Sequence, residues 1–122
     1  MALGTGRDER LVVYGTLAPG LANHHAMDGM TGAWLPARVR GHRRTSGIGE
    51  GGIYPGFVPD STGPEHDVLL FVSPDLPAHL PRLDAFEGED YARVEIVASV
   101  EGQKVDAWVY AEAAAIPVTN RD

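Results

Sequence analysis

Apolar positions recur with a period of two along several short segments, which is the pattern of half-buried strands. The run from Leu11 to Tyr14 is continuously apolar and stops at Gly15, so it predicts a buried strand that ends in a turn. The run from Val68 to Val72 is equally continuous and predicts a central strand. Residues 92–100 and 105–110 alternate on either side of a short polar connection, which predicts a β-hairpin.

Proline and glycine divide the first half of the chain into shorter pieces. Residues 34–44 alternate loosely around Pro36, which predicts a bent strand. Residues 18–32 predict a loop with one helical turn, and the glycine-dense residues 47–56 predict a second loop. A brief strand is expected at residues 57–58, before another turn.

A helical period replaces the strand period after the central strand. Ser73-Pro74 is a typical helix start and Gly88 a typical helix end, so a helix is expected to about Phe86. Pro77 and Pro81 leave two forms open: two short helices, or one helix whose regular part begins late. One side of the helix carries four residues at helical spacing, three apolar and the last acidic: Leu76, Leu80, Leu83 and Glu87.

These elements make about six strands and one main helix, with the helix inserted between groups of strands. The order predicts an α+β domain with a mostly antiparallel sheet. Closure into a small β-barrel would remove the sheet edges, but periodicity does not separate a barrel from an open sheet. A single domain is expected over residues 11–112, after a mobile N-terminal segment of residues 1–10 and before a C-terminal tail of residues 113–122.

Composition narrows the class of partner. The chain has 122 residues, of which 43% are hydrophobic, and this suits one globular domain. A formal net charge of -7 argues against nucleic acid or an anionic membrane as the main partner. No apolar run approaches the ~20 residues of a membrane span, and the first residues lack the apolar core of a signal peptide. The absence of cysteine excludes disulfides and a thiol nucleophile and fits a cytoplasmic protein.

Glu87 is the most informative polar position, because it finishes the apolar side of the helix. A solvated glutamate on a frayed helix end is one interpretation. In the other, burial and the negative end of the helix dipole both disfavour the charged form and raise the pKa of Glu87. A carboxylate poised in this way suits a general base or acid near neutral pH. Both interpretations stay open at this point.

The turn after the first strand is a second candidate. Its backbone amides, from Tyr14 through Gly15 and Thr16 to Leu17, could turn outward and form an anion-binding nest. An ordinary strand-to-loop turn is the simpler interpretation of these residues. The glycine-rich residues 47–52 formally match G-x-G-x-x-G, but no helix follows, so a dinucleotide site is rejected. They are expected to form a pocket wall, with Tyr54-Pro55 as a fixed corner.

Two further clusters carry weaker signals. A basic cluster on the bent strand is either a solvated face or an attraction for an anionic substrate or RNA, and no aromatic interleaving supports RNA; it comprises Arg38, Arg40, His42, Arg43 and Arg44. The adjacent His24 and His25 lack the spacing of a metal site, so no metal is expected. No G-x-S-x-G elbow supports a serine triad.

Taken in order along the chain, these motifs resemble the gamma-glutamylcyclotransferase-like family, which includes the gamma-glutamylamine cyclotransferases. The resemblance runs from about residue 11 to residue 110. It depends on four sequence motifs and a closing strand: Tyr14-Gly15-Thr16-Leu17, Tyr54-Pro55-Gly56, Leu83-Asp84-x-Phe86-Glu87-Gly88, Tyr91-Ala92-Arg93 and Ala107-Trp108-Val109-Tyr110. His66-Asp67 stands near the place where the family often has a Gly-Glu pair.

The resemblance implies a small mixed, mostly antiparallel β-barrel with one main helix packed against it. It also implies an acyltransferase- or lyase-type enzyme that cyclises a gamma-glutamyl group to 5-oxoproline and releases the attached amine. Glu87 would be the general acid/base, and the residues expected to bind substrate are Tyr14, Gly15, Thr16, Leu17, Tyr54 and Tyr91. Asp84 is not the catalytic position of the family.

The expected partner is a small gamma-glutamyl substrate, with no nucleic acid, membrane, metal or organic cofactor, and with a monomer or homodimer as the assembly. Two alternatives remain at this stage. One is gamma-glutamyl transfer or hydrolysis on another metabolite, which would use the same residues. The other is a non-catalytic ligand-binding module of the same fold, in which Glu87 faces solvent or a filled cavity.

Overall fold

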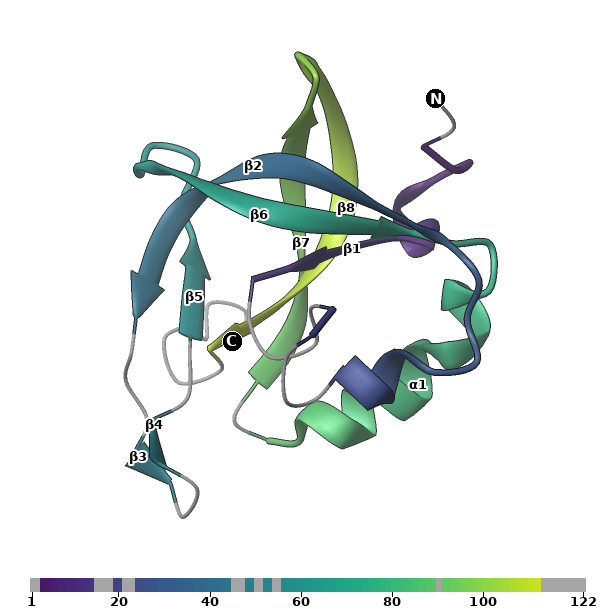
Figure 1. Ribbon diagram of the computed structural model, residues 1–122. Coiled ribbons are helices and arrows are strands. Elements are labelled where there is room, and N and C mark those ends of the chain that lie inside the picture. Colours follow the sequence, from purple (N-terminus) through teal and green to yellow (C-terminus); the bar gives the residue numbers. More distant parts are fainter. Residues whose placement is uncertain are drawn as a thin grey trace, which may run out of the picture.

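Five strands close into a small barrel in the computed structural model, which describes residues 3–14, 19–20, 24–44, 48–49, 52–53, 56–89 and 91–112 (Figure 1). The neighbours around the barrel are, in order, β2 (Ala33–Arg44), β6 (Glu65–Val72), β1 (Arg10–Val13), β8 (Gln103–Glu112) and β7 (Tyr91–Val100). A pairing of Arg38 with Ser99 joins β7 back to β2.

The strand directions make the barrel mixed. The pairs β2–β6, β6–β1, β8–β7 and β7–β2 are antiparallel, while β1 and β8 run parallel. A sixth strand, β5 (Gly56–Pro59), lies antiparallel to the end of β2. The predicted α+β fold is therefore confirmed. The sheet closes into a barrel, as the family resemblance implied, and is not open.

Two segments differ from their expected form. Residues 47–56 were expected to be a loop, but β3 (Ile48–Gly49) and β4 (Gly52–Ile53) pair as a short hairpin beside the barrel (Figure 1). Glycine does not prevent this pairing, because the backbone supplies the hydrogen bonds. The second segment lies within residues 1–10, the N-terminal segment that was expected to be mobile. There, η1 (Arg7–Glu9) is a 3₁₀ helix whose Asp8 carboxylate accepts a 2.9 Å hydrogen bond from the Trp108 indole.

The main helix, α1 (Leu76–Glu87), is continuous, so the late-starting form is the one adopted. The Ser73 hydroxyl accepts a hydrogen bond from the Asp75 amide and donates to the Thr31 carbonyl, so it closes the turn that precedes the helix. Asp75, rather than Ser73, occupies the N-cap position. The helix ends as predicted at Gly88, which has a positive φ of 76° that favours glycine.

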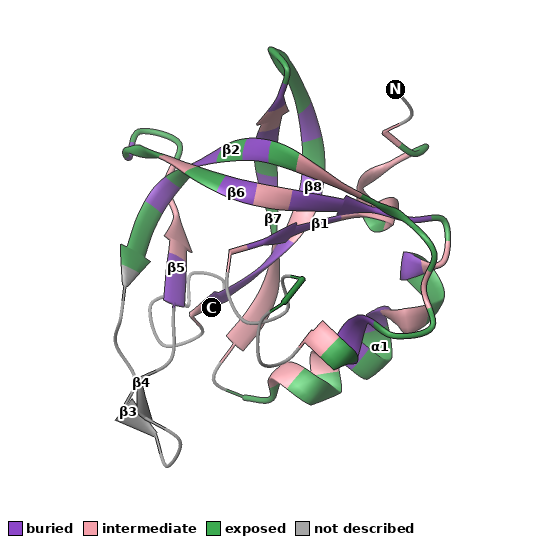
Figure 2. Ribbon diagram, in the orientation of Figure 1, coloured by how far each residue is buried: buried purple, intermediate pink, exposed green. Residues whose placement is uncertain are grey.

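Strand alternation creates two separate cores, which account for the buried bands along the strands in Figure 2. The first fills the barrel and is called the barrel interior; it includes Val12, Val39, Phe57, Leu70, Ile96, Ala98, Ala107 and Val109. The second lies between the strands and α1 and is called the helix seam; it includes Leu11, Val13, Ala26, Met27, Phe71, Leu76, Leu80, Leu83 and Tyr110. Val12 faces one core and its neighbours face the other, which explains the continuously apolar first strand.

Within the described residues, no helix has both the length and the apolar character needed to cross a membrane.

Candidate functional site

Glu87 is the last residue of α1 and continues the side that packs into the helix seam. Leu76, Leu80 and Leu83 on that side are at most 5% exposed, so the apolar stripe is buried as its spacing indicated. The Glu87 carboxyl itself is partly buried, and this loss of water raises its pKa to about 7. Burial is the cause of this shift.

Within the described part of the chain, no hydrogen bond or ion pair joins the carboxylate of Glu87 to another residue. At pH 7 a carboxyl with a pKa of about 7 exists as comparable amounts of acid and base. Such a group can accept a proton and return it within one catalytic cycle.

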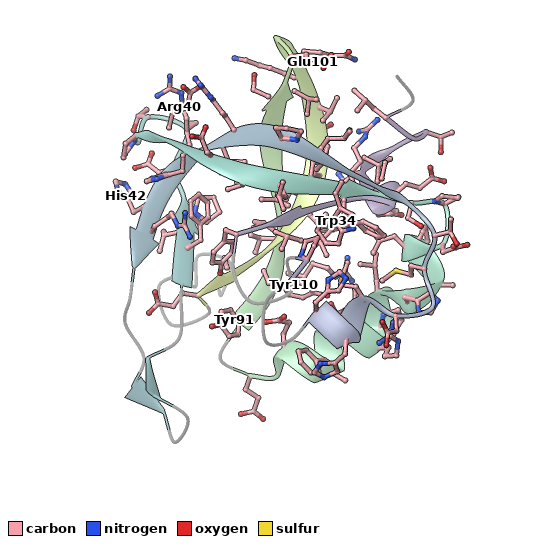
Figure 3. The ribbon with its side chains drawn as sticks, viewed as in Figure 1. Trp34, Arg40, His42, Tyr91, Glu101 and Tyr110 are labelled. Atoms are coloured by element: carbon pink, nitrogen blue, oxygen red, sulfur yellow. The ribbon has the colours of Figure 1, made fainter. Side chains whose placement is uncertain are left out.

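Tyrosine side chains lie near this carboxylate: Tyr14 and Tyr110 interact electrostatically with Glu87, and Tyr91 interacts with Tyr14. Tyr14, at the end of β1, donates a 2.6 Å hydrogen bond from its hydroxyl to the Tyr110 carbonyl. Burial raises the pKa of Tyr14, and the nearby Tyr91 and Glu87 raise it further. Figure 3 shows Tyr91 and Tyr110 on the side of the barrel where α1 lies. The structure therefore brings together three predicted site residues: Glu87, Tyr14 and Tyr91.

The other predicted binding residues, Gly15, Thr16, Leu17 and Tyr54, lie outside the described residues. The start of their turn is described through Tyr14, whose carbonyl accepts a 2.9 Å hydrogen bond from Nη2 of Arg43 on β2. Arg43 thus brings a positive charge to the same end of β1 as Glu87. None of the described carboxylates forms an ion pair with it.

A polar network lies beside Glu87, and the sequence analysis predicted no functional role for its residues. Asp84, one helical turn earlier, accepts hydrogen bonds at Oδ1 from Nε of Arg93 at 2.8 Å and from the Tyr110 hydroxyl at 2.7 Å. Its Oδ2 accepts from Nη2 of Arg93 at 3.1 Å. The Arg93 hydrogen bonds lower the pKa of Asp84, and burial raises the pKa of Tyr110.

Arg93 is held from its other side by an aromatic ring. Its guanidinium carbon lies 4.3 Å from the ring centroid of Trp108, which is a cation–π arrangement. The planar guanidinium can stack on this ring while its nitrogens face the Asp84 carboxylate. The sequence contained a partial signal for this network, because Asp84 lies in the motif that ends at Gly88 and Arg93 in the motif that follows it. Their pairing required knowledge of how α1 lies against β7.

The basic cluster on β2 is largely paired. Arg38 contacts Glu65 and Asp67 at 3.4 and 3.2 Å, and Arg40 donates to the Gly63 carbonyl. His42 lies 2.9 Å from Asp60, and hydrogen bonds from His42 and Thr62 together lower the pKa of Asp60 to about 2. Figure 3 shows Arg40 and His42 away from the tyrosines of the candidate site. The solvated-face interpretation therefore fits Arg38, Arg40 and His42, while the Arg44 side chain lies outside the described part.

Among the described residues, no group of three or more histidine, aspartate or glutamate side chains is arranged to hold a metal ion. The site instead combines one carboxyl of raised pKa with neutral tyrosine hydroxyls and one exposed guanidinium. Such a set can bind an anionic substrate and move a proton within it.

Comparison with known proteins extends these observations. A family model described as "Gamma-glutamyl cyclotransferase, AIG2-like" matches residues 11–121. An AIG2-like protein from Mus musculus has a crystal structure that superposes with a TM-score of 0.61 at 25% identity. That match covers 91% of this chain and 81% of the mouse chain. A search of curated protein sequences found no match.

Two structures with lower sequence identity to this chain show that they share its fold, and no more. The solution structure of an Arabidopsis thaliana protein gives a TM-score of 0.68 at 24% identity, over 95% of this chain and 70% of that one. Allophanate hydrolase from Kluyveromyces lactis gives a TM-score of 0.60 at 18% identity, over 87% of this chain and only 18% of the hydrolase. The same barrel and helix therefore also occur as a small part of a much larger chain.

Proposed function

The chain belongs to the gamma-glutamyl cyclotransferase, AIG2-like family, and we propose that it converts a gamma-glutamyl amine to 5-oxoproline and the released amine. The single observation that carries this proposal is the Glu87 carboxyl, held at the helix seam beside Tyr14 with a pKa of about 7. A general base for an amine needs a pKa in this range.

The reaction is an intramolecular aminolysis. Ionised Glu87 accepts a proton from the α-amino group of the substrate, whose nitrogen then attacks the γ-carbonyl carbon. The new C–N bond closes the five-membered lactam, and the original amide C–N bond breaks. Glu87 returns its proton to the departing nitrogen, so the products are 5-oxoproline and a free amine. Because amine and carbonyl belong to one molecule, holding the substrate folded supplies proximity. The steps need neither a metal nor an organic cofactor.

We assign substrate positioning to the end of β1. The guanidinium of Arg43, bound to the Tyr14 carbonyl at 2.9 Å, is suited to hold the α-carboxylate of the glutamyl group. The backbone amides of Gly15, Thr16 and Leu17 remain our prediction for the oxyanion that develops on the γ-carbonyl. Tyr91, which acts electrostatically on the buried Tyr14 hydroxyl, would line the pocket, and Tyr54 stays a predicted substrate contact.

The wider setting follows from the same chemistry. The substrate is a small molecule, and the acidic chain is not suited to nucleic acid or an anionic membrane. We propose a cytoplasmic enzyme that acts as a monomer or homodimer.

A panel of gamma-glutamyl amines and dipeptides, assayed for 5-oxoproline by mass spectrometry, tests the reaction. Wild-type protein should release 5-oxoproline from at least one of them, whereas Glu87→Gln should lose at least ~100-fold in turnover. Glu89→Gln is a matched control, because Glu89 is an exposed glutamate just beyond the helix end. Glutamate in place of 5-oxoproline would mean hydrolysis. Full activity of Glu87→Gln would remove this residue from the mechanism.

A further inference from the structure

The Asp84 carboxylate, one helical turn before Glu87, is the group whose neighbours need explanation. Its two oxygens receive both Nε and Nη2 of Arg93 and the hydroxyl of Tyr110, at distances from 2.7 to 3.1 Å. The Asp84 backbone carbonyl also accepts the Gly88 amide at 3.1 Å, which closes the helix end. One residue thus ties the last turn of α1, and with it Glu87, to both β7 and β8.

The network continues toward the substrate side of the site. Tyr110 uses its hydroxyl for Asp84 and its carbonyl for the Tyr14 hydroxyl, so β1 is linked to the helix end through a single residue. Trp108 supports Arg93 by stacking on its guanidinium. Each member is therefore fixed by at least two contacts. Because these residues have little freedom to move, they also fix the last turn of α1, and with it the position of Glu87.

The charges of the network also cancel. Asp84 carries one negative charge and Arg93 one positive charge, and their contact is two-pronged, with side chains that are 41% and 23% exposed. The titratable and charged groups around the Glu87 position come from all the packed elements: Asp84 of α1, Tyr14 at the end of β1, Arg43 of β2, Tyr91 and Arg93 of β7, Tyr110 and Glu112 of β8, and His25 of η2 (His24–Met27), which contacts Phe86. Asp84 and Arg93 stand out because loss of either leaves a net charge about one turn from Glu87.

We propose that Asp84, Arg93 and Tyr110 form a charge-neutral clamp that positions Glu87 and shields it from a net charge, so that these three are positioning residues for the general base. This inference rests on the proposed function for the role of Glu87, but not for the electrostatic behaviour of the clamp. Burial can then set the proton affinity of Glu87 without interference from Asp84. A purely structural role would make no distinction between removing the negative and the positive member.

Two substitutions separate the charges. Asp84→Asn keeps an acceptor for Tyr110 but leaves Arg93 as an uncompensated cation, so Glu87 should titrate at a lower pH. Arg93→Gln leaves Asp84 as an uncompensated anion, so Glu87 should titrate at a higher pH. Each shift is expected to be on the order of one pH unit. The double variant restores neutrality and should titrate near the wild-type pH.

The titration is read directly by NMR of protein labelled with 13C at the glutamate side-chain carboxyls. The Glu87 signal is assigned by its loss in Glu87→Gln. Arg38→Gln is the matched control, because Arg38 also pairs with carboxylates but lies on the exposed face of β2. Opposite shifts in the single variants and recovery in the double variant support the clamp. Equal, absent or same-direction shifts would overturn it.

A second readout separates this inference from the proposed function. If 5-oxoproline is formed, the pH at which kcat/KM levels off should move in the same directions as the NMR titration. If no gamma-glutamyl amine reacts, the proposed function fails, while the NMR titration still decides the clamp. Should Arg93→Gln not fold, Arg93→Lys keeps the charge and should leave the Glu87 titration near wild type. Asp84→Asn then supplies the charge test alone, and an unchanged titration in it would count against the clamp.

Discussion

The barrel interior and the helix seam use the same strands but differ in what they bury. The buried members of the interior cluster are all apolar, from Val12 to Val109, with the Tyr14 ring packed at the margin. The seam buries leucines from α1 against aromatic side chains and includes Tyr110, whose hydroxyl needs a partner. The helix seam therefore combines packing with polar chemistry, whereas the barrel interior meets the candidate site at its margin, through Tyr14.

This difference shows where a small barrel can hold a reactive carboxyl. An acid inside the barrel would lose all its water and would need full pairing. At the end of the seam, Glu87 loses part of its water, which is enough to raise its pKa to about 7. The neighbouring Asp84 pairs with Arg93, and the hydrogen bonds from Arg93 lower the pKa of Asp84. Two carboxyls one turn apart thus have opposite shifts because their partners differ.

The largest expected effect on the free energy of unfolding comes from a substitution in the barrel interior. Leu70 is fully buried there, so Leu70→Ala should cost ~2–5 kcal/mol of unfolding free energy through lost transfer energy and a cavity. Denaturant unfolding followed by circular dichroism measures this loss. Leu69→Ala, at a partly buried neighbouring position on the opposite face of β6, is the matched control and should cost less. Equal losses would mean that the interior is not the main source of stability.

The next largest effect concerns how much folding stability is lost when the partly buried Glu87 carboxyl is ionised. Its folded pKa of about 7 exceeds the ordinary glutamate pKa of 4.5, so the folded state binds more protons between these values. Stability from this group is therefore full below pH 4.5 and is lost as pH rises through 7. Glu87→Gln should stabilise the protein at pH 8 by up to ~3 kcal/mol and change it little at pH 4. Thermal unfolding at both pH values checks this, and destabilisation at pH 8 would contradict it.

A smaller effect is expected for one hydrogen bond of the seam. Tyr110→Phe removes the hydroxyl that donates to Asp84 at 2.7 Å but keeps the ring in its packing. The expected loss is about 1.5–3 kcal/mol, the usual range for a hydrogen bond to a charged group. Urea unfolding at pH 7 provides the measurement. No loss would show that solvent satisfies Asp84 equally well.

The smallest effect is expected on the exposed face of β2. Arg38 is 61% exposed and its partners are 41% and 88% exposed, so these ion pairs are well solvated. Arg38→Gln should change the unfolding free energy by less than ~1 kcal/mol. Urea unfolding of Arg38→Gln and Arg93→Gln, measured in parallel, should show the larger loss for Arg93. The reverse order would remove the distinction between the surface pair and the seam pair.

Much of the fold could be predicted from periodicity. The alternation in residues 92–100 and 105–110 is realised in β7 and β8, and the stripe of Leu76, Leu80 and Leu83 is buried as its spacing indicated. Closure was implied by the family resemblance but not by periodicity, because the ring is completed by the pairing of Arg38 with Ser99, far apart in sequence. Alternation shows which side of a strand is buried, but not which strand lies beside it.

Tyr14 and Tyr91 were expected from the family resemblance. Without the resemblance, a site residue was predictable only where it broke its own pattern. Glu87 did so, because an acid ended an apolar helix side. Asp84 and Arg93 did not, since an acid on a helix and a base on a strand are ordinary surface residues. Their significance comes from their contact with each other, which joins α1 to β7. Arg43 was one of five basic positions, and the hydrogen bond to Tyr14 distinguishes it.

The pH dependence of kcat/KM for 5-oxoproline release tests the central claim most directly, because it joins the pKa of Glu87 to its role as base. If ionised Glu87 is required, kcat/KM should rise about tenfold per pH unit in acid and level off near pH 7. Glu87→Gln should lack this limb as well as most of the activity. A wild-type rate that is unchanged between pH 5 and pH 8 would contradict the account.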